Sequence, residues 1–557
     1  MRARKGLEEV MPYSVPISRR GMIRLDLNEN TQSCSLRAVE AIKDINSADI
    51  SSYPDYALLI DDISTNLSLQ PASILPTNGA DGAIRSVMDT YIAEDDKIVL
   101  PTPYFSMYKI IAEVRGAEVV AVPYNEDLSF PEKALLAQRG KLTVIVNPGN
   151  PTGSRIPRDT FIEIMGEVEG IVILDEAYYQ FAGESFIDLI ERFDNLIVIH
   201  TFSKAYGLAG LRLGYIASAS QNIEEIRKVN PPFPVSSAAV VAGRAAIADT
   251  EHIKRVVTEI RKEKEFLHTQ LTKMGVKTRR TKTNFILVQT GEETSRVCSE
   301  LRKRGILVKN MSTFPLLKGY LRVTVGTHTG NIVLLKTLRE ILPLQGILFD
   351  MDGVLVDVGE SYRRTIKETA EEFRGEEVSM EEIEEYKKRG GYNNDWDLTE
   401  ALIRSSGKKI LRETIIEHFQ RRYLGKNFDG YIANEQWLLD KSLLRELSTR
   451  YSLGIVTGRP REEAVYTLTR EKVAKYFDCV ITMDEVPGKE KPDPYGIRMA
   501  VQQLDISRAL YLGDTVDDLR AATSAGVIPV SIGLGGIREE NVVYILKSVN
   551  EIEEIVW

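Results

Sequence analysis

The chain has 557 residues, of which 43% are hydrophobic and 27% are charged, and its formal net charge is −9. A single hydrophobic core rarely grows beyond ~300 residues, so this length predicts two or three domains. The composition is typical of a soluble globular protein and excludes lasting disorder over most of the chain. The acidic balance argues against a nucleic-acid partner, because binding phosphates along a duplex requires a basic face.

The cysteines and the apolar runs restrict the cellular setting. Cys34, Cys298 and Cys479 lie far apart and form no C-x-x-C pair, which argues against a disulfide framework or a structural zinc site. No apolar run reaches the ~18 residues of a membrane-spanning helix. The basic first residues meet Glu8 and Glu9 before any apolar stretch, unlike a secretory signal. We therefore expect a cytoplasmic protein without a membrane partner.

Short runs of Val, Ile and Leu alternate with longer amphipathic stretches along the chain. Such runs predict buried parallel strands when they end in polar residues or glycine. The amphipathic stretches 252–274 and 361–388 predict helices. The alternation predicts an α/β protein with two doubly wound sheets. The predicted strands cover residues 97–101, 142–148, 171–177 and 196–202 in one set and residues 346–353, 453–458 and 509–514 in a second set.

A domain boundary is predicted near Pro343. The helical pattern of residues 331–342 ends at this proline, which cannot continue the helical hydrogen bonds, and a new buried strand begins at Gly346. The chain is thus expected to divide into residues 1–343 and residues 344–557.

The stretch TFSKAYGLAGLRLGY (201–215) carries the most chemistry in the first part. It places Ser203 and Lys204 after an apolar strand, and Arg212 follows in a glycine-rich context. A lysine can bond covalently to an aldehyde, and a serine and an arginine suit a phosphate dianion. A lone lysine is more often a solvated surface charge, so this stretch needs support from elsewhere in the sequence.

Three upstream motifs supply that support. Asp175 ends a predicted strand and could pair with a protonated ring nitrogen, although alone it could cap a helix. NPGNPTG (147–153) places Asn150 in a turn, and TNGADGAIRSV (77–87) opens a helix whose first N–H groups suit a phosphate. Together with Lys204 they favour one site that binds a phosphorylated aldehyde.

These motifs, with LDLNENT (25–31), SSYPDYA (51–57), PTPYFSMY (101–108) and LRVTVGT (321–327), resemble the fold-type I aminotransferases that use pyridoxal 5′-phosphate (PLP). Within that group the sequence is most similar to histidinol-phosphate aminotransferases. The resemblance implies a homodimer with its active site at the subunit interface. It also implies a large domain over about 50–250 and a small domain from residues 1–49 and 251–343.

The resemblance assigns roles to individual residues. Lys204 would bind the coenzyme covalently and shuttle the proton, and Asp175 would pair with the pyridine nitrogen. The other implied coenzyme contacts are Asn150 and Tyr178 at the ring hydroxyl, Gly79, Ala80, Asp81, Ser203 and Arg212 around the phosphate, Tyr104 stacked on the ring, and Tyr53 reaching the phosphate of the neighbouring subunit.

Arg322 matches the family arginine that binds the substrate carboxylate, and its planar fork suits that anion. Asn28 in LDLNENT is a second implied substrate-binding residue. Histidinol phosphate has no α-carboxylate. If it is the substrate, Arg322 would alternately hold its phosphate and the carboxylate of glutamate.

The second part contains four motifs in a fixed order: an aspartate pair, a threonine, a lysine and a second aspartate pair. GILFDMDGVLVD (346–357) places Asp350 and Asp352 at a strand end, where one carboxylate can act as nucleophile and the other as acid and base. Each motif alone is common in loops or helix caps. Carboxylates gathered around one lysine suit Mg²⁺ and a phosphoryl group. The motifs that follow contribute Thr457 from IVTGRP, Lys491 from KEKPDP, and Asp514 and Asp518 from YLGDTVDDLRAA.

That order resembles the haloacid dehalogenase-like phosphatases over residues 346–557. The likeness implies that Asp350 attacks phosphorus and that Asp352 serves as acid and base. A helical cap over about 362–450 would select the leaving group, with Gly390–Tyr392 as a candidate substrate loop. Thr457 and Lys491 would hold the phosphoryl oxygens, with Lys489 as the alternative lysine, although Lys491 before a proline matches better. Mg²⁺ would bind Asp350, Asp514 and the backbone carbonyl of Asp352, and Asp518 would support the site.

The sequence therefore favours a bifunctional enzyme with small-molecule substrates. One unit would exchange the amino group of histidinol phosphate with 2-oxoglutarate, and the other would hydrolyse a phosphate monoester, for which histidinol phosphate is the first candidate. One alternative is a threonine-phosphate decarboxylase or an aromatic aminotransferase fused to a phosphatase for another metabolite. The other alternative is a non-catalytic regulatory protein.

Overall fold

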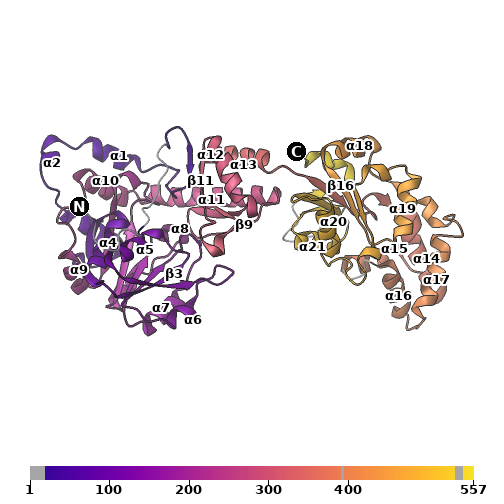
Figure 1. The fold of residues 1–557 in the computed structure, drawn as a ribbon, viewed down its shortest axis with the longest axis horizontal. Coiled ribbons are helices and arrows are strands. Elements are labelled where there is room, and N and C mark those ends of the chain that lie inside the picture. The colour runs from indigo at the N-terminus through magenta and orange to yellow at the C-terminus, as the bar shows by residue number, and fades with distance from the viewer. Residues whose placement is uncertain (1–9, 11–18, 390–393, 534–543, 557) are drawn as a thin grey trace. The chain divides into compact units, whose positions relative to one another are not determined.

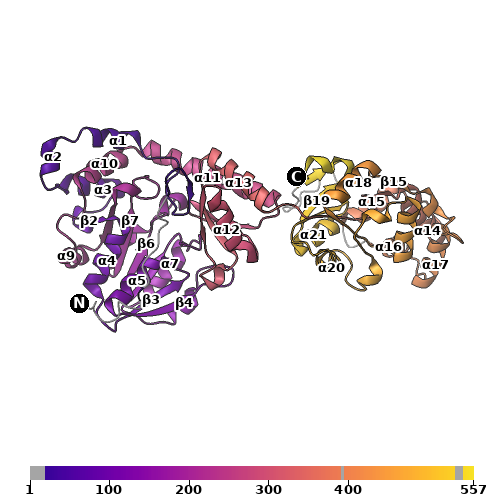
Figure 2. The ribbon, with the colours of Figure 1, turned by 45° about the horizontal axis from the view of Figure 1, so that its top comes forward.

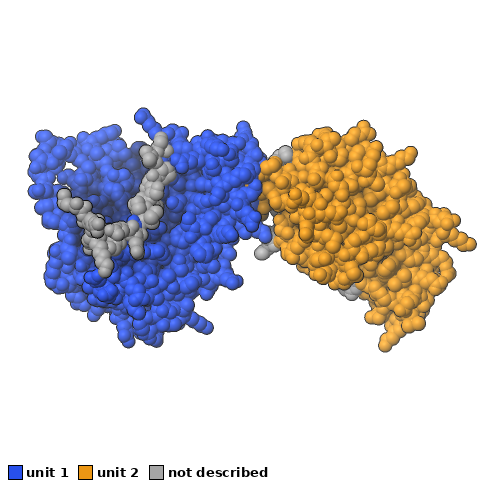
Figure 3. Space-filling view, in the orientation of Figure 1, with its two compact units in different colours: residues 1–271, 276–341 blue, residues 272–275, 342–557 orange. Residues whose placement is uncertain are grey.

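The computed structural model describes residue 10 and residues 19–389, 394–533 and 544–556. It contains two compact units, formed by residues 1–271 with 276–341 and by residues 272–275 with 342–557 (Figures 1 and 3). None of the helices described is long and apolar enough to cross a membrane. The candidate loop Gly390–Tyr392 lies outside the described residues.

A seven-stranded sheet in the order β2–β8–β7–β6–β5–β3–β4 forms the centre of the first unit (Figure 2). The four strands predicted in this unit become β3, β5, β6 and β7, and they pair in parallel. β8 is antiparallel to both β2 and β7, so the sheet is mixed. The strands are β2 (Ile74–Asn78), β3 (Lys97–Thr102), β4 (Glu118–Pro123), β5 (Leu142–Val146), β6 (Ile171–Asp175), β7 (Leu196–Thr201) and β8 (Leu213–Ser218).

Helices connect these strands. Several begin or end at capping residues: the Ser236 side chain accepts a hydrogen bond from the Ala239 N–H at the start of α10, and α5 ends at Gly116 in the left-handed conformation. The helices are α1 (Leu36–Lys43), α2 (Ser47–Ser51), α3 (Ala57–Leu67), α4 (Gly79–Tyr91), α5 (Ser106–Arg115), α6 (Glu132–Leu136), α7 (Arg158–Glu167), α8 (Tyr179–Ala182), α9 (Ser220–Arg227), α10 (Ser237–Ala248) and α11 (Thr250–Lys273).

A second sheet in the first unit has the order β1–β11–β12–β10–β9. It joins the start of the described chain to residues beyond α11, because β1 pairs in parallel with β11 while the other strands pair antiparallel. Its elements, with two helices, are β1 (Ile23–Leu25), β9 (Thr278–Arg279), β10 (Phe285–Gln289), α12 (Thr294–Lys303), β11 (Ile306–Asn310), β12 (Tyr320–Thr324) and α13 (His328–Ile341).

The second unit is built on a parallel sheet in the order β17–β16–β13–β18–β19–β20. The three strands predicted here become β16, β13 and β18, which are neighbours. Functional side chains gather where the carboxyl ends of parallel strands meet. The elements are β13 (Gly346–Phe349), α18 (Lys441–Arg450), β16 (Ser452–Val456), α19 (Arg461–Arg470), β17 (Cys479–Ile481), α20 (Tyr495–Gln503), β18 (Ala509–Gly513), α21 (Val516–Ala525), β19 (Ile528–Ile532) and β20 (Tyr544–Leu546).

Helices inserted after β13 form the cap of the second unit. Two short antiparallel strands, β14 (Val356–Asp357) and β15 (Gln436–Trp437), pair where the chain leaves and re-enters the core. The predicted helical stretch 361–388 is interrupted, because α14 ends at Gly375, whose φ of +75° favours glycine. The cap contains a π-helical turn η6 (Gly359–Arg363) and the helices α14 (Arg364–Arg374), α15 (Met380–Arg389), α16 (Asp395–Ser405) and α17 (Arg412–Tyr423).

Candidate active sites

One cavity of the first unit is lined by most of the residues predicted to bind coenzyme and substrate. Gly79 and Tyr53 are the two that do not line it. The predicted residues on its wall are Asn28, Ala80, Asp81, Tyr104, Asn150, Asp175, Tyr178, Ser203, Lys204, Arg212 and Arg322.

Asp175 ends β6 and is almost fully buried in this cavity. The hydroxyl of Tyr108 donates to Oδ2 at 2.8 Å, and the N–H of Ala177 donates to Oδ1 at 3.0 Å. Burial raises the pKa of Asp175, and both hydrogen bonds oppose that rise. The carboxyl group is thus oriented for a cationic ring nitrogen. Tyr108, on α5, was not among the predicted site residues.

A phosphate cradle lies at the start of α4. Gly79 has φ of +65°, and a Cβ at this position would lie 2.8 Å from Nη2 of Arg212. Arg212 donates to Asp81 Oδ2 at 2.8 Å and to Ser203 Oγ at 3.4 Å. N–H groups at the start of a helix attract anions. A serine, an arginine and a helix start packed this closely fit the phosphate of PLP.

The Lys204 amine lies in the same cavity, three residues after β7 ends. Its Nζ donates to the carbonyl of Leu27 at 3.1 Å and lies 5.6 Å from the ring centroid of Tyr178. Asn28 donates to the Tyr178 hydroxyl at 2.9 Å. These contacts fix the lysine beside the aromatic residue predicted to hold the coenzyme hydroxyl.

A second pair of cations faces the cavity from the five-stranded sheet. Arg322, on β12, donates to Asn150 Oδ1 and to the carbonyl of Asp26, both at 2.7 Å. Lys309, on β11, stands opposite Arg322 in the strand pairing and also lines the cavity. Burial lowers the pKa of Lys309, and Arg322 adds to the effect. Sequence reasoning missed Lys309 because only the pairing of β11 with β12 places it there.

Tyr53 lies outside this cavity. The residue is 78% exposed, and its ring stacks on Phe233 with ring centroids 4.0 Å apart. Its predicted role concerns the neighbouring subunit and stays a prediction.

In the second unit, Lys491 joins two of the predicted aspartates. Its Nζ lies 2.9 Å from Asp350 Oδ1 and 2.6 Å from Asp518 Oδ1, and it donates to the Tyr511 hydroxyl at 3.1 Å. Burial alone would lower the pKa of Lys491, but the two carboxylates raise it. Burial raises the pKa of Asp350; Lys491 opposes the rise, and the neighbouring aspartates add to it.

A cluster of carboxylates in this site fits a divalent cation. Asp350, Asp514 and Asp518 each offer a ligand atom, and these atoms lie within 4.8 Å of one another. Such hard oxygen donors suit Mg²⁺. Gly353 permits the arrangement, because its φ is +70° and a Cβ there would lie 2.0 Å from Asp514 Oδ2. Asp518, predicted as a supporting residue, thus belongs to the cluster itself.

The carboxylate of Asp352 faces the same cavity as Asp350, Lys491 and Asp514. Its Oδ1 accepts from Nε of Arg459 at 2.6 Å. The hydroxyl of Thr457 accepts from the N–H of Arg459 at 3.2 Å, and Thr457 lines an adjoining cavity that shares Lys491. Among the cap residues that line the Asp352 cavity are Arg363 and Trp396.

Arg459 is a residue of this site that sequence reasoning missed. It belongs to the motif IVTGRP, two residues after Thr457. Its position in that motif was a usable signal, but its contact with Asp352 depends on the folding of two loops onto each other.

Comparisons with known proteins match both units. The family model described as aminotransferase class I and II matches residues 20–338, and the model described as haloacid dehalogenase-like hydrolase matches residues 347–532. A histidinol-phosphate aminotransferase from Methanococcoides burtonii is 38% identical over 58% of this chain and 90% of its own length. One from Thermoanaerobacter pseudethanolicus is 34% identical over 61% of this chain and 97% of its own length.

Solved structures share the fold of the first unit. The histidinol-phosphate aminotransferase of Sinorhizobium meliloti, in complex with pyridoxal-5′-phosphate, superposes with a TM-score of 0.58 and 24% identity, over 61% of this chain and 97% of that chain. The L-threonine-O-3-phosphate decarboxylase of Porphyromonas gingivalis gives a TM-score of 0.52 and 22% identity, over 58% of this chain and 99% of that chain.

Proposed function

We propose that this chain is a bifunctional enzyme acting on histidinol phosphate. The chain belongs to the class I and II aminotransferases, and a haloacid dehalogenase-like hydrolase follows that unit. Its first unit would exchange the amino group of histidinol phosphate with 2-oxoglutarate, using PLP. Its second unit would hydrolyse a phosphate monoester, with histidinol phosphate as the first candidate and Mg²⁺ as the metal.

The observation that carries the first activity is the presence of two separate anion-binding groups in one cavity. Ser203 and Arg212, beside the start of α4, suit the coenzyme phosphate, and Lys309 and Arg322 on the five-stranded sheet suit an anion on the substrate. PLP, when bound, supplies an electron sink for the carbon that carries the amino group. Asp175 would hold the ring nitrogen, and Lys204 would move the proton at the reacting carbon.

The test of the first activity compares the two half-reactions. We expect glutamate and histidinol phosphate to react in turn, and Arg322→Ala to slow both, since both anions would use this arginine. Loss of only one half-reaction would contradict the shared role of Arg322. Direct analysis of the products separates amino transfer from decarboxylation of threonine phosphate, which would release carbon dioxide.

The second activity follows from the group around Lys491. Asp350 would attack phosphorus, forming a new oxygen–phosphorus bond as the ester oxygen leaves, and Asp352 would protonate that oxygen. Asp352 would then take a proton from the water that releases phosphate from Asp350. Mg²⁺ on the cluster of Asp350, Asp514 and Asp518 would offset the repulsion between carboxylates and phosphate.

The test of the second activity is phosphate release from a panel of esters with and without a chelator. We expect release to require Mg²⁺ and to be fastest with histidinol phosphate. Release from histidinol phosphate no faster than from unrelated sugar phosphates would reject it as the substrate.

A homodimer is part of this proposal. The first unit exposes large apolar side chains that one subunit leaves uncovered, and a subunit interface would bury them. Tyr53 would then reach the coenzyme phosphate of the other subunit. These side chains include Leu36, Ile50, Tyr53, Leu58 and Phe233.

A further inference from the structure

A buried arginine holds Asp352, the side chain proposed as acid and base in the second unit. Nε and Nη2 of Arg459 lie 2.6 Å and 2.5 Å from Oδ1 of Asp352. The Arg459 side chain has no exposed surface, whereas that of Asp352 is 26% exposed. A fully buried guanidinium is costly unless its charge is paired. The pairing of Arg459 therefore fixes the orientation of the Asp352 carboxylate.

Both contacts go to the same oxygen of Asp352. The described residues provide no hydrogen bond to Oδ2, and Asp352 lines the cavity that also contains Asp350 and Lys491. Arg459 therefore holds one oxygen of a carboxylate that lines the cavity proposed to bind the ester. Arg459 itself cannot give up a proton in a protein, so it orients the carboxyl group without replacing it.

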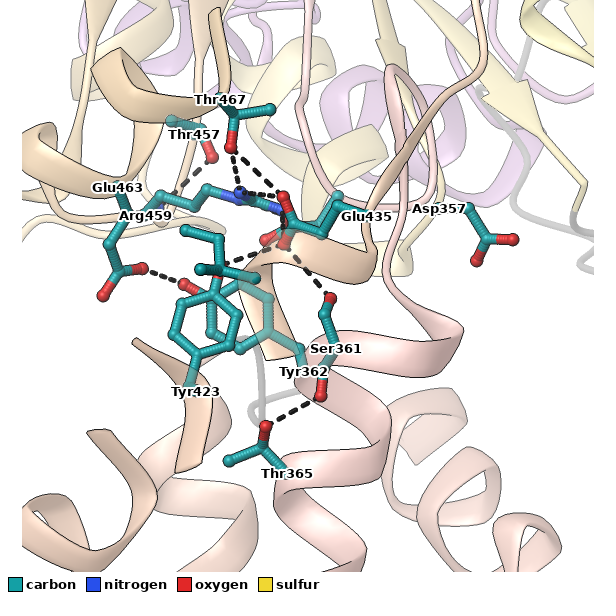
Figure 4. A network of polar contacts seen from close by, with 12 residues as sticks. Asp357, Ser361, Tyr362, Thr365, Tyr423, Glu435, Thr457, Arg459, Glu463 and Thr467 are labelled. Atoms are coloured by element: carbon teal, nitrogen blue, oxygen red, sulfur yellow. Dashed lines mark hydrogen bonds and ion pairs between the residues drawn. The ribbon is translucent and has the colours of Figure 1, made fainter. Parts of the chain in front are cut away.

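Glu435 anchors Arg459 from its other side (Figure 4). Its carboxylate accepts from Nη1 at 3.0 Å and from Nη2 at 2.9 Å, a bidentate pair with no exposed surface on either side chain. Glu435 also accepts from Ser361 Oγ at 3.1 Å and from the Tyr423 hydroxyl at 2.9 Å, and both residues belong to the cap.

The anchor lies where the chain passes between core and cap. Glu435 immediately precedes β15, and Ser361 lies in the turn that follows β14, the partner of β15. The guanidinium carbon of Arg459 also lies 5.1 Å from the ring centroid of Tyr362, beside Ser361. Arg459 thus contacts Asp352 in the core. Through Glu435 it also contacts both crossings of the cap (Figure 4).

We propose that Arg459 is a positioning residue that, anchored by Glu435, sets the orientation of Asp352 for proton transfer and links that orientation to the cap crossings. This inference rests on the phosphatase function proposed above. It predicts that disturbing Arg459 affects esters whose leaving group needs a proton far more than esters whose leaving group does not.

Leaving-group dependence is the test. In Arg459→Lys, a point charge replaces the fork that bridges two carboxylates. We expect kcat/KM to fall about 100-fold for the alkyl phosphate that the wild type hydrolyses fastest, as for a misplaced catalytic group. For p-nitrophenyl phosphate, whose leaving group departs without a proton, we expect a loss below about threefold. The double variant Arg459→Met/Glu435→Gln, which leaves neither charge of that pair behind, should behave in the same way.

The control is Tyr423→Phe, which removes one hydrogen bond from Glu435 and leaves the contact between Arg459 and Asp352 intact. We expect Tyr423→Phe to change kcat/KM for the two esters equally, and only slightly. Asp352→Asn must lower kcat/KM selectively for the alkyl phosphate if Asp352 is the acid, because kcat/KM reports the attack of Asp350 and not the later step in which Asp352 acts as base. Failure of this selectivity would reject the proposed mechanism and this inference together. A different result overturns only the positioning role. In that result Asp352→Asn lowers kcat/KM selectively for the alkyl phosphate, whereas both Arg459 variants lower kcat/KM equally for the two esters.

Discussion

The Asp175 carboxyl group can pair with a coenzyme cation only while it is ionised, and its surroundings oppose ionisation. Burial raises its pKa, and the hydrogen bonds from Tyr108 and from the Ala177 N–H work in the other direction. The backbone donor is present whatever the sequence. The hydroxyl of Tyr108 is therefore the side-chain donor whose hydrogen bond favours the charged form.

Tyr108→Phe should weaken coenzyme binding. A hydrogen bond to a charged group contributes about 1.5–3 kcal/mol, so the dissociation constant of PLP should rise about 10- to 100-fold. Titration of the coenzyme-free protein, followed by visible absorption, measures it. Tyr91→Phe is the control, because Tyr91 donates at 2.9 Å to Asn222, which does not line the coenzyme cavity. An equal loss in both variants would contradict a specific role for Tyr108.

Gly353→Ala should abolish phosphate release and spare amino transfer. The added Cβ would meet Asp514 Oδ2 at 2.0 Å, within the carboxylate cluster. Gly375→Ala separates this clash from backbone strain, because Gly375 has a similar φ of +75° and its nearest atom is the flexible end of Lys408, 3.4 Å away. Gly375→Ala should lower stability by about 1 kcal/mol and keep phosphate release. Similar inactivation in both variants would mean that strain, not the clash, is responsible.

Helix α19 contacts the cap through several side chains, one of which is a buried carboxyl group. Glu463 accepts hydrogen bonds from the hydroxyl of Tyr362, in η6, and from Gln420 of α17 at 3.1 Å. Burial raises the pKa of Glu463 to about 7; Tyr362, Gln420 and Arg459 oppose the rise, and Asp352 adds to it. The junction between these helices therefore depends on pH.

The stability of the second unit should fall as pH rises from 4.5 to about 7. In that window the folded state holds a proton on Glu463 that the unfolded chain has released, so folding is favoured most at the acidic end. The full pKa shift of Glu463 corresponds to a pH-dependent change of about 3 kcal/mol in the free energy of unfolding. We expect Glu463→Gln to remove this pH dependence. All three tryptophans, Trp396, Trp437 and Trp557, lie beyond Pro343, so tryptophan fluorescence during urea unfolding reports this unit. Equal pH dependence in wild type and variant would contradict the assignment.

The sequence predicted the elements whose signal is local. Continuous Val, Ile and Leu runs such as 97–101 and 509–514 became strands, because a strand buried on both faces needs apolar residues throughout. The five-stranded sheet was not predicted, since it pairs residues 23–25 with 306–308, and no local pattern reports so distant a pairing. For the same reason Lys309 and Arg459 were missed. The domain limits stay predictions.

The predicted fusion of an aminotransferase with a haloacid dehalogenase-like hydrolase is confirmed. Each unit has its own cavity lined by predicted site residues. Lys204→Ala should therefore eliminate amino transfer and the visible absorption of the bound coenzyme while phosphate release continues. Asp350→Asn should do the reverse. Assays of both activities on both variants check this, and loss of both activities in either variant would show that the two chemistries are not separable.

The proposed dimer requires that one active site use residues of two chains. Lys204 lies in the cavity of its own chain, whereas Tyr53 is exposed and lies outside that cavity. A Lys204→Ala chain with normal Tyr53 should therefore complete the site of a Tyr53→Ala chain with normal Lys204. At low coenzyme concentration each variant alone should be nearly inactive.

Mixing the two variants under conditions that exchange subunits should restore amino transfer to about a quarter of the wild-type value, because half of the dimers are mixed and each mixed dimer has one complete site. The measurement is transaminase activity before and after exchange, with a mixture of Lys204→Ala and the double variant Lys204→Ala/Tyr53→Ala as the control. That control contains no complete site and should stay inactive. If the first mixture also stays inactive although exchange has occurred, Tyr53 does not act across the interface, because nothing else distinguishes the mixed dimer from its parents.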